Sequence, residues 1–316
     1  MATEASTGAP ARMQGVLTPV ITPFDKDLNP DAKRLVNQCR WLLTQNVGLA
    51  IFGTNSEANS LSVEEKIELM DALVEAGIPA ARMMPGTGCC AVTDSARLTA
   101  HAVKLGAGGV LMLPPFYYKG VSDDGLFAAF AQVIERVGDA RLRVYLYHIP
   151  PVSNVPLSLP LIERLIKAYP ETVVGIKDSS GMWSNTEAML DAKWDDFRIF
   201  PGSEEFLLAA MRKGGAGCIS ATANVNPAAI HALYANWRAA DADDQQAKLN
   251  AVRGSFAGYV MIPGLKAVTA HYAGDDAWRA TRPPLVALTA AEQKALVAKL
   301  ETHGFAMRGL TAKAAE

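Results

Sequence analysis

The feature that most constrains this chain is a regular alternation of short apolar runs with segments of helical periodicity. Eight strand-like runs occur in its first 220 residues, and a helical segment follows each one. Two parallel strands need this spacing, because the connection between them is a crossover of a dozen or more residues, usually a helix. The runs span residues 15–21, 48–52, 82–85, 109–113, 143–147, 172–176, 197–200 and 217–220.

Eight strand–helix units predict an α/β fold, the (β/α)8 or TIM barrel, which takes about 250 residues. A doubly wound open sheet is the alternative, but no G-x-G-x-x-G fingerprint follows the first run. We therefore expect the barrel over residues 15–240. Residues 1–14 are small and polar and are expected to form a flexible tail. Residues 241–316 carry only helical patterns, which predict a C-terminal helical extension.

The composition argues against several classes of function. The 316 residues hold 30 basic and 32 acidic side chains, so there is no basic excess for nucleic acid or an anionic membrane. No apolar run reaches the roughly 18 residues of a membrane span. The four cysteines form no C-x-x-C pair, and the five histidines show no metal-ligand spacing. We expect a cytoplasmic protein with free thiols and with neither metal nor cofactor.

Polar residues follow four of the predicted strands. In a barrel, catalytic groups lie at the C-terminal ends of the strands, where the βα loops gather. We therefore expect these segments to surround the functional site. They are Gly53-Thr54-Asn55-Ser56-Glu57, Tyr147-His148, Lys177-Asp178 and Gly202-Ser203-Glu204-Glu205.

Lys177 ends an otherwise apolar run. Period-2 alternation places Val173, Gly175 and Lys177 on one face, and Gly175 is expected to leave room for the lysine stem. An ordinary lysine, with a pKa of about 10.4, is only about 0.04% neutral at pH 7. Burial lowers the pKa and so makes the amine a better nucleophile. From this residue alone, a strand-end lysine that reaches solvent is an equal alternative.

Two further segments suggest chemistry beside this lysine. Tyr147 at a strand end could transfer protons, or it could be a core aromatic with a satisfied hydroxyl. Thr54 and Asn55 offer hydroxyl, amide and backbone N–H groups that can bind a carboxylate. Taken alone, the same loop fits ordinary turn chemistry better.

The motifs taken together carry a family resemblance. Gly53-Thr-Asn-Ser-Glu57, Tyr147-His-Ile-Pro150 and Gly175-Ile-Lys-Asp178 resemble the dihydrodipicolinate synthase / N-acetylneuraminate lyase family. The usual family forms are G-[TS]-T-G-E, Y-N-[VI]-P and G-I-K-[DE]. Thr18-Pro-Val-Ile-Thr-Pro23 and Gly217-Cys-Ile-Ser-Ala-Thr-Ala-Asn224 also look like family blocks. Five ordered blocks form a specific signal that covers most of the barrel.

The resemblance implies a cofactor-free class I aldolase. Lys177 matches the lysine that forms a Schiff base with pyruvate, a 2-oxo acid, before a carbon–carbon bond to an aldehyde is made or broken. Tyr147 matches the proton-relaying tyrosine, and Thr54 matches the hydroxyl linked to it. Asn55 stands where the family usually has a second hydroxyl that grips the pyruvate carboxylate.

The resemblance also implies oligomerisation and a second substrate pocket. Tyr118 matches a tyrosine that reaches into a neighbouring subunit's site, which implies a homotetramer built as a dimer of dimers. Four more positions match residues that face the substrate: Ile219, Gly202, Glu204 and Val152.

Several positions depart from the family pattern. Ser56 replaces a glycine, and Val152 replaces the arginine that grips the second carboxylate in dihydrodipicolinate-forming members. Val152 therefore argues against lysine biosynthesis. His148 is expected to be packed and hydrogen-bonded, facing away from Tyr147. Glu204 and its neighbour Glu205 match acids that contact substrate hydroxyls in lyases, although charges favoured at a helix N-terminus explain them equally well.

The reaction itself stays open at this point. The alternatives are a 4-hydroxy-tetrahydrodipicolinate synthase, a 2-oxo-3-deoxy sugar acid dehydratase, and a pyruvate-binding regulatory barrel without turnover. Two other lysines are weaker candidates for the Schiff base: Lys266 lies in a predicted helix of the extension, and Lys119 lies in a loop beside Tyr118.

Overall fold

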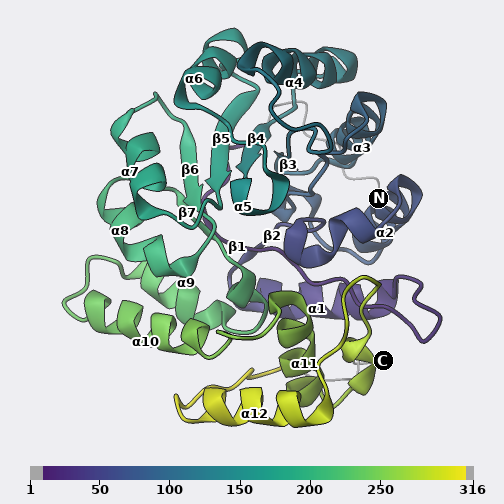
Figure 1. Cartoon of the computed structure of the whole chain (residues 1–316), viewed down its shortest axis with the longest axis vertical. Coiled ribbons are helices and arrows are strands. Elements are labelled where there is room, and N and C mark those ends of the chain that lie inside the picture. The colour runs from purple at the N-terminus through teal and green to yellow at the C-terminus, as the bar shows by residue number, and fades with distance from the viewer. Residues whose placement is uncertain (1–9, 311–316) are drawn as a thin grey trace.

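The computed structural model describes residues 10–310 as parallel strands surrounded by helices (Figure 1). The strands form two sheets, in the orders β2-β1-β7 and β3-β4-β5-β6, and every pair is parallel. Their bounds are β1 (Gly15–Thr18), β2 (Gly48–Leu49), β3 (Val110–Met112), β4 (Val144–His148), β5 (Val173–Asp178), β6 (Arg198–Pro201) and β7 (Gly217–Ile219).

Short backbone contacts join the two sheets into a closed barrel. The predicted third strand at residues 82–85 is reduced to two bridges, Leu49 with Met83 and Gly86 with Leu111. Pro85 has no backbone N–H, so the ladder is interrupted there. On the other side, the Ala216 amide donates to the Ile199 carbonyl at 3.0 Å. The predicted (β/α)8 barrel is confirmed, with a third strand shorter than expected.

The outer helices begin at side chains that can cap them. Asp31, Ser62 and Ser158 each accept a hydrogen bond from a backbone N–H in the first turn that follows. The ring comprises α1 (Ala32–Thr44), α2 (Val63–Glu75), α3 (Val92–Leu105), α4 (Asp123–Val137), α6 (Leu159–Ala168), α7 (Trp183–Asp191), α8 (Leu207–Arg212) and α9 (Pro227–Ala235), with the short α5 (Pro150–Ser153) after β4.

Three helices follow the barrel: α10 (Ala242–Gly254), α11 (Met261–Ala273) and α12 (Ala290–Glu301). They lie together on one side of the molecule, below α1 and α9 in Figure 1. Helix α10 packs on α8, α9 and the 3-10 turn Glu204–Phe206. Helix α11 contacts the 3-10 turn Thr54–Ser56. Within residues 10–310, no helix is both long and apolar enough to cross a membrane.

Tyr145 closes the N-terminal end of the barrel. A Cβ atom added to Gly109 or to Gly175 would lie 2.5 Å from a carbon of its ring. Its Oη accepts a hydrogen bond from the Met13 amide at 2.6 Å, and burial raises its pKa to about 12. Gly175 thus makes room for Tyr145, and not for the stem of Lys177 as the sequence suggested. Residues 1–9 of the predicted tail lie outside the described residues.

Candidate active site

Tyr147 and Lys177 lie side by side at the C-terminal ends of β4 and β5. They are register partners, and Lys177 Nζ donates to Tyr147 Oη at 3.3 Å. The same nitrogen lies 4.4 Å from the centroid of the tyrosine ring. The two residues are only 3% and 2% exposed. Lys177 is therefore not a strand-end lysine that simply extends into solvent.

The loop after β2 adds a second hydroxyl to this pair. Thr54 Oγ1 lies 3.1 Å from Tyr147 Oη, within hydrogen-bond distance. The phenol oxygen therefore connects the lysine amine to the threonine hydroxyl. Such a chain can carry a proton between the amine and a bound molecule, because each oxygen can both donate and accept.

Buried interactions fix the loop that carries Thr54. Ser56 Oγ accepts from the Gly53 amide at 3.2 Å, so the serine that replaces the family glycine supports the turn. Glu57 adopts a left-handed conformation, with φ of 56°, and forms an ion pair with Lys266 of α11. Lys266 is fully buried, which lowers its pKa to about 8. Lys266 stabilises the loop through Glu57 and does not line the cavity described next.

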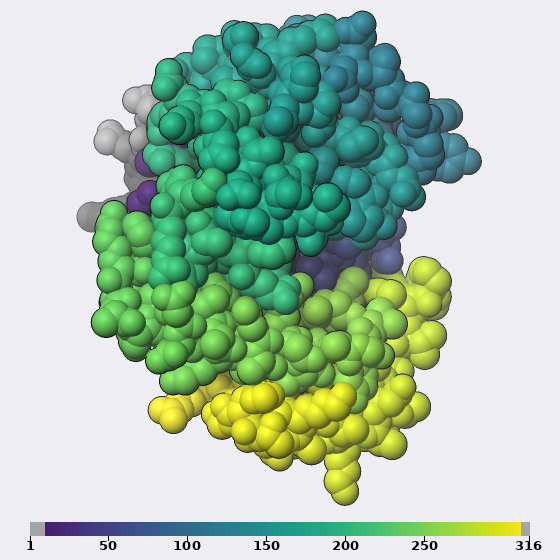
Figure 2. All heavy atoms as spheres, turned by 60° about the vertical axis from the view of Figure 1, so that its left-hand side comes forward, coloured from purple at the N-terminus to yellow at the C-terminus, as the bar shows by residue number. Residues whose placement is uncertain are grey.

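A cavity of about 350 Å³ opens at the C-terminal end of the barrel, a usual size for a small-molecule site. In Figure 2 the teal barrel segments and the green C-terminal extension meet along a hollow. Phe206, Arg253, Val260 and Ile262 contribute to its walls. The residues predicted from the sequence that line it are Thr54, Asn55, Tyr147, Val152, Lys177 and Gly202.

Three predicted residues are not among those that line this cavity. Ile219 is fully buried in the barrel interior. Glu204 is 1% exposed, and its carboxylate accepts hydrogen bonds from two hydroxyls of the segment after β7 and from Arg253 Nη1 at 3.0 Å. Tyr118 is 73% exposed, in the loop after β3. A single chain therefore does not bring the Tyr118 hydroxyl to the buried amine.

Arg253 is the cavity residue that the sequence did not indicate. It lies in the last turn of α10, outside the barrel, where the strand-end rule does not apply. Its side chain reaches the cavity because α10 packs on the 3-10 turn that follows β6. Only the tertiary packing of the extension identifies it.

His148 is packed beneath the site, as predicted. Its Nδ1 accepts a hydrogen bond from the Leu157 amide at 3.0 Å, and its Nε2 lies 3.9 Å from a carboxylate oxygen of Asp178. The side chain is buried, which lowers its pKa. It therefore joins the end of β4 to the segment before α6 and lies beside the end of β5.

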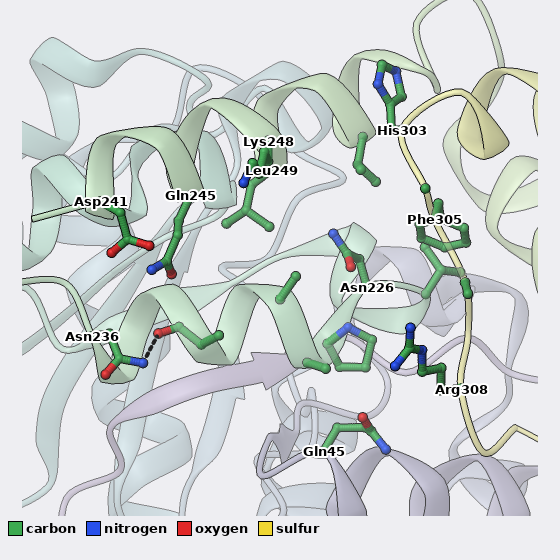
Figure 3. Close-up of a pocket in the computed structure, with 18 of the residues that line it drawn as sticks. Gln45, Asn226, Asn236, Asp241, Gln245, Lys248, Leu249, His303, Phe305 and Arg308 are labelled. Carbon is green, nitrogen blue, oxygen red and sulfur yellow. Dashed lines mark hydrogen bonds between the residues drawn. The ribbon is translucent and has the colours of Figure 1, made fainter. Parts of the chain in front are cut away.

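A second cavity, of about 620 Å³, lies outside the barrel between α1, α9, α10 and the segment after α12. Figure 3 shows Gln245 and Lys248 of α10 above it and Arg308 beside it. None of the motif residues line this cavity. Across the described chain, no group of three or more His, Cys, Asp or Glu side chains is placed to hold a metal ion.

The comparisons with known proteins agree with the geometry. The sequence matches the dihydrodipicolinate synthetase family over residues 12–303. A DapA-like lyase of Chloroflexus aurantiacus is 33% identical over 294 residues, which cover 92% of this chain and 97% of the relative. The crystal structure of dihydrodipicolinate synthase from Agrobacterium tumefaciens has a TM-score of 0.84 at 32% identity and covers 91% of this chain and 98% of its own.

A more distant structure has the same architecture. A catalytic-lysine mutant of Ruminococcus gnavus sialic acid aldolase has a TM-score of 0.84 and covers 93% of this chain and 96% of its own. Its identity is 20%, so the likeness shows the fold alone. The predicted class of enzyme, a pyruvate-dependent Schiff-base lyase, is confirmed at the level of the family. The chain belongs to the dihydrodipicolinate synthetase family.

Proposed function

We propose that this chain makes or breaks a carbon–carbon bond between pyruvate and an aldehyde through a Schiff base on Lys177. The observation that carries the proposal is the hydrogen-bonded chain from Lys177 Nζ to Tyr147 Oη to Thr54 Oγ1, which lines a cavity of about 350 Å³. A buried amine beside a phenol provides both the nucleophile and the proton donor that imine formation needs.

The chemistry follows from these positions. Lys177 Nζ attacks the C2 carbonyl of pyruvate to give a carbinolamine, and Tyr147 donates a proton to the departing oxygen, which leaves as water. The resulting iminium withdraws electrons, so the Tyr147 phenolate can take a proton from C3, which gives an enamine and restores the phenol. The enamine carbon attacks the aldehyde carbon, and the relay with Thr54 delivers a proton to the new alkoxide. Hydrolysis frees the product, and the reverse sequence cleaves it.

Asn55 is proposed to bind the pyruvate carboxylate. Its side chain lines the cavity next to Thr54, and no hydrogen bond joins its amide to another described residue. The amide is therefore available to donate to a ligand. Backbone N–H groups of the same turn can add to this carboxylate site.

Tyr118 is proposed to act in a second subunit of a homotetramer. Tyr117 and Tyr118 are each 73% exposed, and Val121 nearby is 41% exposed. Large exposed aromatic side chains of this kind are typical of protein interfaces. Light scattering checks the assembly, and Tyr118→Ala checks whether the activity of one subunit depends on its neighbour.

We also propose a cytoplasmic location. The free state of all four cysteines is consistent with it.

The runner-up reaction is synthesis of 4-hydroxy-tetrahydrodipicolinate, the activity named for several relatives, among them one from Bartonella bacilliformis. The apolar Val152, which lines the cavity, favours the lyase reading because it provides no positive charge for a second carboxylate. Dehydration of a 2-oxo-3-deoxy sugar acid uses the same enamine. A pyruvate-binding barrel without turnover is the non-enzymatic alternative. A screen of aldol substrates for pyruvate release separates the lyase from the other three.

Trapping with borohydride tests the Schiff base directly. Incubation with pyruvate and borohydride should leave one reduced pyruvate on the peptide that contains Lys177. Lys177→Ala should give no adduct and no turnover while its circular dichroism spectrum is retained. Lys119→Ala, which changes an exposed lysine, is the matched control. Absence of an adduct on Lys177 in the unmodified protein would contradict the proposal.

A further inference from the structure

Arg253 provides an arginine at the cavity that the mechanism above does not use. It comes from the extension, and its side chain is 21% exposed where it lines the cavity that also holds Lys177. Dihydrodipicolinate-forming members of the family carry an arginine after the tyrosine motif. In this chain Val152 stands at that position. The cavity therefore has a guanidinium group, but on a different wall and with different partners.

Two carboxylates hold this guanidinium in place. Arg253 Nη1 donates to Glu204 at 3.0 Å, and Nε donates to Glu205 at 2.8 Å. Glu204 is 1% exposed and also accepts hydrogen bonds from two hydroxyls, so both of its oxygens are engaged within the protein. Among the described residues, Nη2 of Arg253 has no hydrogen-bond partner. That nitrogen retains both of its N–H donors for a ligand.

The acidic pair thus acts on the arginine and not on the substrate. Carboxylates that faced the cavity would accept hydrogen bonds from substrate hydroxyls. With Arg253 in front of them, this wall of the cavity donates hydrogen bonds instead. The positive charge is already balanced by Glu204 and Glu205. The guanidinium has two edges that can bind a carboxylate bidentately, Nε with Nη2 and Nη1 with Nη2, and in each of them one nitrogen already donates to a glutamate.

We propose that Arg253 is a specificity-determining residue that binds an uncharged oxygen, such as a hydroxyl, on the aldehyde substrate. Glu204 and Glu205 are positioning residues that hold its guanidinium. The apolar walls formed by Val152 and Val260 take the carbon chain of the same substrate. The inference rests on the proposed pyruvate chemistry, because it assigns the second substrate of that reaction.

The test compares three aldehydes in the condensation with pyruvate. Glyceraldehyde carries hydroxyls, propionaldehyde carries none, and succinic semialdehyde carries a carboxylate. The unmodified protein should prefer glyceraldehyde over propionaldehyde by about 10- to 100-fold in kcat/KM, the range expected for one hydrogen bond to a charged group. Arg253→Lys, which keeps the charge but loses Nη2, should abolish most of that preference. Arg212→Lys, at an exposed pair with Asp243, is the matched control.

A further variant tests the charge balance. Glu205→Gln removes one compensating charge, so it should raise kcat/KM for succinic semialdehyde relative to glyceraldehyde. An unchanged hydroxyl preference in Arg253→Lys would overturn the inference, as would a preference for succinic semialdehyde that is lost in that variant. Borohydride trapping of pyruvate is run on every preparation. A trapped adduct with unchanged selectivity refutes only this inference, whereas no adduct in the unmodified protein refutes the proposed function itself.

Discussion

Removal of the Tyr147 hydroxyl is the sharpest perturbation of the proposed relay. Tyr147→Phe keeps the ring, which Lys177 Nζ approaches to 4.4 Å from the centroid, and deletes only the oxygen between that nitrogen and Thr54. A positioned acid–base group contributes about 10²- to 10⁴-fold, or about 2.7–5.5 kcal/mol of transition-state stabilisation. We therefore expect kcat to fall by that factor while the protein remains folded.

A double-mutant cycle gives the relay a stricter test. Thr54→Val should cost less than Tyr147→Phe, about 10- to 100-fold, because water can replace a terminal hydroxyl of the relay more easily than its central one. The double variant should be little worse than Tyr147→Phe alone, since groups that act as a unit are not additive. The assay follows pyruvate consumption together with quenched borohydride trapping. Additive losses, or a fully active Tyr147→Phe, would refute the relay.

Three further predictions concern packing, reactivity and pH. Gly175→Ala should destabilise the protein by at least about 2 kcal/mol, measured by urea unfolding, because its Cβ would lie 2.5 Å from the Tyr145 ring. Native protein should be alkylated at the exposed Cys90 but not at Cys218, whose pKa burial raises, as peptide mass mapping would show. Burial lowers the folded-state pKa of His148, so the unfolded chain binds more protons below about pH 6.5, and stability should fall as the pH drops through that region. His148→Gln should flatten this dependence of the melting temperature on pH.

The barrel could be predicted because its signals are local. Each strand is a short apolar run, each helix carries its own periodicity, and their order alone implies parallel pairing. The reduced third strand was missed because Pro85 removes a donor without changing the apolar pattern. The neighbour of Gly175 was missed because it lies on another strand. Tyr145 of β4 is the register partner of Gly175, and no pattern within β5 alone reports which residue of β4 lies beside it.

Some residues of the candidate site could likewise be predicted from local patterns, and others could not. Thr54, Tyr147 and Lys177 could be predicted because each follows a strand, and the barrel brings strand ends together. The partners of Glu204 could not be predicted, since the arginine that pairs with it lies on α10, far along the chain. Its position depends on how one helix packs on a loop, which neither periodicity nor spacing encodes.

The buried pair of Glu57 and Lys266 has a consequence for the order in which the protein is made. The loop with Thr54 emerges early during synthesis, but the lysine that neutralises Glu57 belongs to α11 and emerges much later. Until then, burial of the unpaired carboxylate has a large desolvation cost. The final conformation of the loop is therefore unfavourable at that stage. A nascent chain that ends with the barrel strands would hold the lysine and tyrosine yet have no pocket for pyruvate. The site can bind pyruvate only after the C-terminal helices have been synthesised and have packed on the barrel.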